Sequence, residues 1–160
     1  MDDLDSHVIE LFATEPRIGV LEASRRLGVA RGTVQARLDR LATTGVVTGW
    51  GPDLSPEALG FPVMAFLTLE IRQDATAHGG HNAIAAHLAR IPEVLEAYTI
   101  TGAGDMWARV VARSNADLQR VIDQVLADRG IERSTTVIAL AAQIKHRVLP
   151  LARVAALARS

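Results

Sequence analysis

Two groups of residues in this chain have types and a spacing that could do chemistry. The first is a segment from residue 16 to 49, in which six arginines meet only two acids. Guanidinium groups bind phosphates and guanine edges, so the segment is typical of a nucleic-acid surface, although a solvated helix face can look the same. The second is the turn Thr101-Gly102-Ala103-Gly104-Asp105. Its open backbone N–H groups could hold a carboxylate, and Asp105 could accept hydrogen bonds from an ammonium group. The alternative, which the motif alone favours, is a glycine hairpin in which Asp105 stabilises the turn and no ligand binds.

The rest of the chain does not share this basic character. The 160 residues carry a formal net charge of −1, and residues 1–15 hold five acids and no base. The absence of cysteine excludes a disulfide scaffold, a thiolate metal site and a cysteine nucleophile. No apolar run is long enough to span a membrane, and the N-terminus begins with acids where a signal peptide carries bases. We therefore expect a cytoplasmic protein without a membrane partner.

The apolar spacing of the first fifty residues predicts three helices. They run from Leu4 to Pro16, from Val20 to Leu27, and from Arg31 to Thr43. A tight glycine turn joins the last two, which is the pattern of a helix-turn-helix. Residues 46–50 are expected to follow as a short extended segment.

A linker is predicted at residues 51–62, which are rich in glycine, proline and serine. After it, strands are expected at 63–71, 94–101, 106–112 and 136–144, and helices at 82–91 and 115–127. The order βαββαβ is the ferredoxin-like arrangement, so the predicted class is α+β. The predicted division is a helix-turn-helix domain at 1–50, the linker at 51–62, a ferredoxin-like effector-binding and dimerisation domain at 63–148, and a tail at 149–160.

In that arrangement both helices cover one face of the sheet and leave the other bare. Residues 63–67 and 137–142 are apolar without alternation, so the uncovered face is expected to be apolar too. A second copy of the chain is the simplest cover. A long core strand, or cover by the tail, is the alternative.

A helical wheel places Val34, Leu38 and Leu41 on the buried side of the third helix, with Gly32 and Ala36 opposite. Two small residues would let the helix axis approach base edges. The predicted DNA-binding residues are Thr33, Gln35 and Arg40 for base edges, Arg31 and Arg37 for phosphates, and Arg17, Arg25 and Arg26 for the backbone from neighbouring elements. An ion pair with the acidic first helix is an equal alternative for Arg37.

Enzyme motifs and metal sites receive little support. The histidines at 78, 81 and 87 could be read as a metal cluster, but their spacing does not place them on one helical face, and a solvated loop is favoured. No catalytic triad order, Walker loop or HExxH motif is present. No cofactor is expected.

Taken together, these residues resemble the Lrp/AsnC, or feast/famine, family of bacterial and archaeal transcriptional regulators. The resemblance covers Leu4 to about Ile144 and is carried by Leu27-Gly28-Val29, Thr33-Val34, Arg37-Leu38, Gly45-Val46-Val47-Thr48-Gly49-Trp50, Pro92-Glu93-Val94 and Thr101-Gly102-Ala103-Gly104-Asp105. Ala30 departs from it, because the family has a serine that caps the recognition helix there. The missing cap would weaken the helix start by about 1 kcal/mol.

The resemblance implies a winged helix-turn-helix and a RAM/ACT-like domain. It also implies double-stranded DNA as a partner, an imperfect inverted repeat as the target, and homodimers that assemble into higher oligomers. An amino-acid effector would bind the glycine turn together with Ser134, Thr135 and Thr136. Two alternatives remain: a nucleoid-type architectural protein without effector, and an enzyme similar to the sirohaem decarboxylases, which share the two-domain plan.

Overall fold

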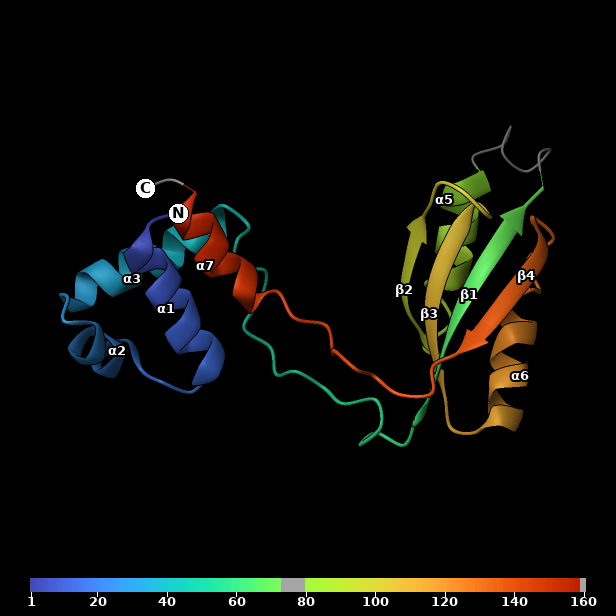
Figure 1. Ribbon diagram of the computed structural model, residues 1–160, viewed down its shortest axis with the longest axis horizontal. Helices are drawn as coiled ribbons and strands as arrows, with labels where there is room; N and C mark the ends of the chain where they lie inside the picture. Colours follow the sequence, from blue (N-terminus) through green and yellow to red (C-terminus); the bar gives the residue numbers. More distant parts are fainter. Residues whose placement is uncertain (73–79, 159–160) are drawn as a thin grey trace. The chain divides into compact units, whose positions relative to one another are not determined.

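The computed structural model of the chain describes residues 1–72 and 80–158. Its internal contacts form two compact units (Figure 1). One comprises residues 1–52 together with the chain from residue 144 onward, and the other comprises residues 53–143. Each unit encloses a hydrophobic core of its own, which is the usual mark of a structural domain.

The first unit contains the three predicted helices: α1 (Asp3–Thr14), α2 (Val20–Leu27) and α3 (Arg31–Thr43). A reciprocal capping box starts α1, because the carboxylate of Asp2 accepts from the N–H of Asp5 and the carboxylate of Asp5 accepts from the N–H of Asp2, both at 2.9 Å. Gly28 ends α2 in the left-handed conformation, at φ 66°. No side chain caps α3 at Ala30, as the sequence predicted.

The core of this unit joins all three helices. Val8 of α1 and Ala23 of α2 are buried against Val34, Leu38 and Leu41 of α3. The predicted buried stripe of α3 is therefore confirmed. The opposite side of α3 faces away from this core.

The predicted extended segment at residues 46–50 was wrong. All five residues are described, and they form no strand. The N–H groups of Val46 and Val47 instead donate to the carbonyl of Leu41, at 2.9 and 3.0 Å, and so close the end of α3. A single short apolar run has no neighbouring strand to pair with here, and an unpaired strand is not stable.

The tail, for which the sequence predicted no element, forms α7 (Leu149–Leu157). This helix packs against α1. Arg153 of α7 forms an ion pair with Glu10 of α1. No helix in the described part of the chain has both the length and the apolar character needed to span a membrane.

The second unit has the predicted βαββαβ order, and the α+β class is confirmed. Its elements are β1 (Val63–Ile71), α5 (Gly80–Leu88), β2 (Val94–Thr99), β3 (Met106–Ala112), α6 (Asn115–Val125) and β4 (Ile131–Ile138). The antiparallel sheet has the order β2-β3-β1-β4. Both helices lie on one face of it (Figure 1).

The last strand begins and ends earlier than the predicted range of 136–144. It starts at Ile131, after a turn that the carboxylate of Asp128 closes by accepting from the N–H of Gly130 at 2.8 Å. The predicted range rested on the apolar residues 137–142. An edge strand, however, carries polar side chains on its exposed positions, and β4 is an edge strand.

The sheet face away from the helices is mixed rather than uniformly apolar, which corrects the prediction. Burial alternates along β1: Leu67 and Leu69 are buried toward α5 and α6, whereas Phe66, Thr68 and Glu70 are half-buried on the other side. On that side, which we term the open sheet face, Trp107 stacks on Phe66 at a centroid distance of 5.2 Å and contacts Tyr98 at 5.9 Å.

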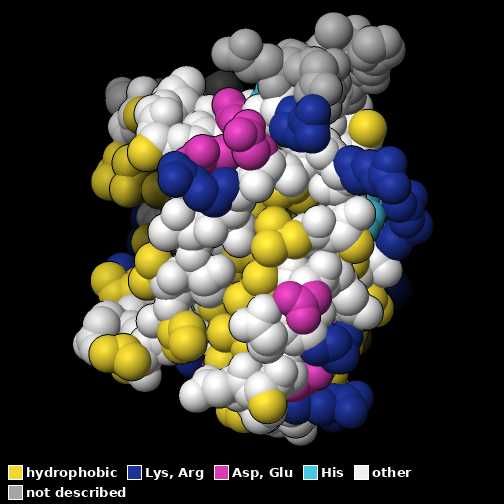
Figure 2. All heavy atoms as spheres, turned by 90° about the vertical axis from the view of Figure 1, so that its right-hand side faces the viewer, with side chains coloured by type: hydrophobic (Ala, Val, Ile, Leu, Met, Phe, Trp, Pro, Cys, Tyr) yellow, Lys and Arg dark blue, Asp and Glu magenta, His cyan; other side chains and the backbone are white. Residues whose placement is uncertain are grey.

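Charged pairs complete the open sheet face. Arg109 pairs with Glu96 at 2.6 Å, and Arg133 pairs with Glu70 at 2.5 Å. Seen from the side of β4 and α6, hydrophobic and charged side chains are likewise interspersed on the surface (Figure 2). Because side chains alternate along a strand, the apolar run 63–67 does place Met64 and Phe66 on this face. The face is mixed because the polar residues Glu70, Glu96, Arg109 and Arg133 lie on it as well.

Candidate functional site

The outer surface of α3 is open at its centre because its middle positions carry very small side chains. Gly32 and Ala36 are both exposed, opposite the buried stripe of α3. A helix with this surface can approach another molecule closely, as a helix must when it enters the major groove of duplex DNA. The exposure of both residues agrees with the helical-wheel prediction.

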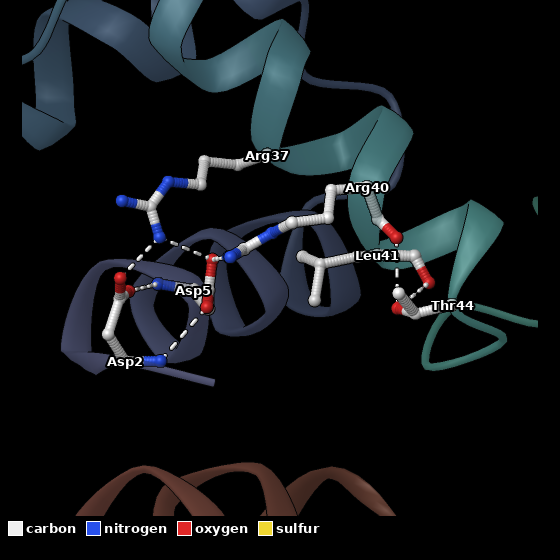
Figure 3. A network of polar contacts seen from close by, with 6 residues as sticks. All are labelled: Asp2, Asp5, Arg37, Arg40, Leu41 and Thr44. Carbon is white, nitrogen blue, oxygen red and sulfur yellow. Dashed lines mark hydrogen bonds and ion pairs between the residues drawn. The ribbon is translucent and has the colours of Figure 1, made fainter. Parts of the chain in front are cut away.

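Two arginines of α3 are tied to the start of α1 (Figure 3). One amino group of Arg37 donates to a carboxylate oxygen of Asp2 and, at 2.9 Å, to Oδ1 of Asp5. Arg40 donates to the same Oδ1 atom. The Asp5 side chain is 1% exposed, whereas 51% of the Arg40 side chain is exposed. One buried anion is thus shared between two arginines that reach the surface.

These contacts keep both aspartates ionised. The hydrogen bonds from Arg37 and from the N–H of Asp5 lower the pKa of Asp2 from 3.8 to about 2. Burial by itself raises the pKa of Asp5, but the N–H of Asp2 and the two guanidinium groups outweigh burial, so this pKa lies below its usual value. Both carboxylates are anions at neutral pH.

The arginine contacts bear on two of the predicted DNA-binding residues. For Arg37 the sequence left open an ion pair with the first helix, and the structure contains that ion pair. Arg40 was expected to extend toward base edges, but its guanidinium bonds to Asp5. A helical wheel gives only the direction of the Cα–Cβ bond and ignores anions on a neighbouring helix. The signal that could have found this contact is the spacing of Asp2 and Asp5, which predicts a capping box at the start of α1.

The two arginines of α2 are paired within the first unit. Arg26 donates to Glu15 at 2.5 Å and to Glu22 at 3.2 Å, and Arg25 lies 3.7 Å from Glu22. The bonds to Glu15 and Glu22 raise the pKa of Arg26. Exposed pairs of this kind contribute little to stability, so another anion can replace them at small cost.

The remaining predicted DNA-binding residues differ in exposure and in whether they contact other side chains of the chain. Gln35 donates to Asp39 at 2.8 Å, one turn further along α3. Thr33 is half-buried. Arg17 and Arg31 are exposed, and neither forms an ion pair with any residue that the structure describes. The structure therefore brings both arginines to the surface of this unit with their charges uncompensated.

In the second unit, the predicted glycine turn connects β2 to β3 and is held against β1. Asp105 accepts from the N–H of Ile71 at 2.7 Å through Oδ2, and its own N–H donates to the carbonyl of Leu69 at 2.9 Å. Gly102 and Gly104 adopt φ values of 102° and 92°, which residues with a Cβ atom rarely adopt. A Cβ on Gly104 would lie 2.4 Å from Cγ2 of Thr68, so this turn requires glycine for space as well.

The predicted partners of the turn, Ser134, Thr135 and Thr136, lie on β4, across β1 from it. Ser134 is paired with Leu69, the residue whose carbonyl receives the N–H of Asp105. The structure therefore brings Ser134 and Asp105 to either side of one β1 residue. Thr135 alternates to the opposite face of the sheet, so the three residues do not share one surface.

The histidines give no metal site in the described residues. No group of three or more potential ligands occurs there, and residue 78 lies outside the described part. His87 of α5 places Nε2 within 2.9 Å of the carbonyl of Gln124 and 3.2 Å of that of Val125. It thereby closes the end of α6, which is a structural role.

Comparisons with known proteins find matches for both units. The family model of the Lrp/AsnC ligand binding domain matches residues 64–149, and that of the AsnC-type helix-turn-helix domain matches residues 1–42. The HTH-type transcriptional regulator FL11 of Pyrococcus furiosus is 29% identical over 94% of this chain and 96% of its own length. Regulatory protein AsnC of Escherichia coli is 28% identical over 94% of this chain and 97% of its own length.

Solved structures agree with these relatives. That of Escherichia coli AsnC superposes with a TM-score of 0.85, at 28% identity, over 94% of this chain and 99% of that one. A transcriptional regulator of Neisseria meningitidis, solved as its L-methionine complex, superposes with a TM-score of 0.79, at 26% identity, over 91% of this chain and 93% of that one. These proteins are transcriptional regulators, so the enzyme alternative is not retained. Because one family model spans more than half of the chain and the other spans the helix-turn-helix before it, this chain belongs to the Lrp/AsnC family of transcriptional regulators.

Proposed function

We propose that this regulator binds duplex DNA sequence-specifically as a homodimer, and that an amino acid acts as its effector by changing its assembly and DNA affinity. The observation that carries the proposal is the outer surface of α3, where Gly32 and Ala36 lie exposed in a unit that also presents uncompensated arginines. The proposal includes a cytoplasmic location, where a bacterial or archaeal chromosome lies.

On DNA, the outer surface of α3 faces base edges in the major groove. Thr33 and Gln35 flank its small central residues and are suited to hydrogen bonds with bases. The guanidinium groups around them meet the phosphate backbone, which supplies most of the affinity and makes it salt-dependent. These phosphate-binding residues are Arg17, Arg25, Arg26, Arg31, Arg37 and Arg40.

The open sheet face is the surface on which two copies pair. Its neighbouring rings of Phe66, Tyr98 and Trp107 supply the large apolar area that favours an interface centre. The ion pairs beside them keep this face soluble in a single chain. A two-fold pair would present two copies of α3, and an imperfect inverted repeat is the target that matches such symmetry. These dimers assemble further into larger particles.

The effector binds at the glycine turn. The backbone N–H groups around Gly102, Ala103 and Gly104 can donate hydrogen bonds to a carboxylate. Oδ2 of Asp105 is used by Ile71, while its other oxygen has no partner among the described residues and is available to an ammonium group. Thr101, Ser134, Thr135 and Thr136 complete the proposed set. The L-methionine complex of the Neisseria meningitidis regulator supports this class of ligand. An effector that binds one assembly of dimers better than another shifts the population toward it and so changes DNA affinity.

Gel retardation of a duplex that the wild-type protein selects from a random pool tests the DNA-binding surface. Arg31→Ala should lower the slope of log affinity against log salt by about one, because one phosphate contact is lost. Arg40→Ala should weaken specific binding. Arg129→Ala is the matched control, since Arg129 is an exposed arginine of the second unit. Equal behaviour of all three variants would reject the assigned surface.

Calorimetry with each of the twenty amino acids at millimolar concentration tests the effector. We expect heat from at least one of them, and we expect Asp105→Asn to abolish it, because the variant keeps an acceptor for the N–H of Ile71 but loses the charge. Absence of heat from all twenty would remove the effector from the proposal and favour an architectural DNA-binding protein.

A further inference from the structure

The contact between α1 and α3 contains a buried carboxylate that the proposed DNA-binding surface does not itself use. Asp5 has no exposed area as a residue, yet it belongs to a surface helix and lies beside two arginines of α3. A buried anion is unfavourable unless it is fully hydrogen-bonded. Asp5 meets this requirement, because it accepts from Arg37, from Arg40 and from the N–H of Asp2.

Each of the two arginines gives only part of its guanidinium group to these acids. Arg37 uses a single amino group for both Asp2 and Asp5, and Arg40 uses a single amino group for Asp5. The remaining N–H donors have no hydrogen-bond partner among the described residues. Because 27% of the Arg37 side chain and 51% of the Arg40 side chain are exposed, both arginines remain accessible at the surface while one end of each is held.

Holding a long side chain in advance changes what it contributes to binding. A free arginine loses much of its rotamer freedom when it meets a phosphate, and this loss subtracts from affinity. An arginine already ordered by a buried acceptor has lost that freedom during folding. The exposed part of these ion pairs adds little to the stability of the fold. The main effect of the arrangement is therefore to position the two guanidinium groups.

From this geometry we propose that Asp5 is a positioning residue for DNA binding, which holds the guanidinium groups of Arg37 and Arg40 in order beside the outer surface of α3 so that their outward N–H donors meet the phosphates of a specific site. This inference rests on the proposed function, since it requires that α3 faces DNA. Specific binding gains from the order, whereas non-specific binding depends mainly on total charge.

The test compares Asp5→Asn with Asp3→Asn. Asp3 lies exposed in the same first turn of α1 and takes part in neither arginine's ion pairs, so both variants remove one negative charge at nearly the same place. The Asn at position 5 can still accept from the N–H of Asp2, which keeps the capping box. Retardation is measured with the selected duplex and with a scrambled duplex of the same composition.

Both variants should bind the scrambled duplex slightly better, because a negative charge is lost near DNA. Only Asp5→Asn should lower the ratio of specific to scrambled affinity, by about tenfold, which corresponds to the rotamer freedom of one to two arginines. Equal ratios for the two variants would overturn the inference. If the wild-type protein shows no preference for the selected duplex, the proposed function fails first, and that result is distinguishable from a failure of Asp5 alone.

A double-mutant cycle then asks whether Asp5 acts through the arginine. In an Arg40→Gln background, Asp5→Asn should cost less specific affinity than in the wild type, because half of what Asp5 positions is already absent. Additive effects would contradict the inference. Circular dichroism establishes that each variant is folded. If Asp5→Asn is unfolded at the assay temperature, Asp5→Glu, which keeps the charge but moves the carboxylate, is compared with Asp3→Glu by the same ratio.

Discussion

Asp5 in the first unit and Asp105 in the second are both carboxylates beside a candidate site, yet they are used differently. Asp5 is saturated: its oxygens accept from one backbone N–H and from two guanidinium groups of another helix. Among the described residues, the carboxylate of Asp105 accepts one hydrogen bond, from the N–H of Ile71. The first therefore orders side chains of its own unit, whereas the second orders a loop and leaves one oxygen for the proposed effector.

The comparison teaches that residue type and exposure do not by themselves assign a role to an acid. An aspartate that faces long cations can position them for another molecule, while an aspartate that faces backbone shapes the chain and leaves one oxygen without a partner among the described residues. The same contrast separates the two candidate sites: side-chain contacts between helices define the first, and backbone geometry around Gly102 and Gly104 defines the second.

The largest expected effect is on the dimer dissociation constant rather than on contact with DNA. Trp107→Ala removes the central ring of the open sheet face and should raise the dimer dissociation constant at least about thirtyfold, as the loss of a central aromatic residue costs roughly 2 kcal/mol or more. Analytical ultracentrifugation measures this. Trp50→Ala, which removes an exposed tryptophan of the first unit, serves as the control. Equal dissociation constants for the two variants would place the dimer interface elsewhere.

The next effect tests whether backbone geometry governs the second unit. Gly104→Ala should destabilise it by about 1–3 kcal/mol, because positive φ is strained and the new Cβ meets Thr68. Gly102→Ala has positive φ but open space around its Cβ, and should cost less. Thermal unfolding gives both values. The Thr68→Ser change, which removes Cγ2, should recover part of the loss in Gly104→Ala. If it recovers nothing, the close contact is not the cause.

A smaller effect tests local order in the first unit. Ala30→Ser should stabilise α3 by about 1 kcal/mol, because residue 30 already has the extended conformation of an N-cap and lacks only the side-chain acceptor. Gly19→Ser, at the uncapped start of α2, should gain only a few tenths of a kcal/mol, since glycine is itself a tolerated cap. Thermal unfolding in which both changes gave the same gain would contradict this account.

The smallest effect concerns pH. Because the pKa of Asp2 is about 2 in the folded chain and 3.8 as its ordinary value, its contribution to stability is present above pH 4 and is lost as the pH falls toward 2. The contribution is under about 1 kcal/mol, since the side chain is half exposed. Asp2→Asn should flatten this part of the curve of unfolding free energy against pH, measured by urea unfolding. An unchanged acid slope would show that Asp2 is not its source.

Much of the fold could be predicted because it depends on neighbours in sequence. The three helices, the buried stripe of α3, the missing cap at Ala30 and the βαββαβ order all follow from periodicity and turn residues within a few positions. The candidate turn at residues 101–105 could be predicted for the same reason, because the need for glycine at positive φ is local.

Other features depended on contacts that local pattern does not contain. The limits of β4 follow from its place at the sheet edge, and the mixed open sheet face follows from strand alternation once the strands are paired. The docking of α7 on α1 joins the two ends of the chain.

The amino-acid sequence by itself determined where the chain turns, which residues are apolar, and where cations concentrate. Only the tertiary structure decided which anion each arginine meets. Arg40 and Asp5 are 35 residues apart in sequence and come together because the buried faces of α1 and α3 pack against each other. The physical reason is that the strength of a charged contact depends on distance and burial in space, whereas periodicity records only position along the chain.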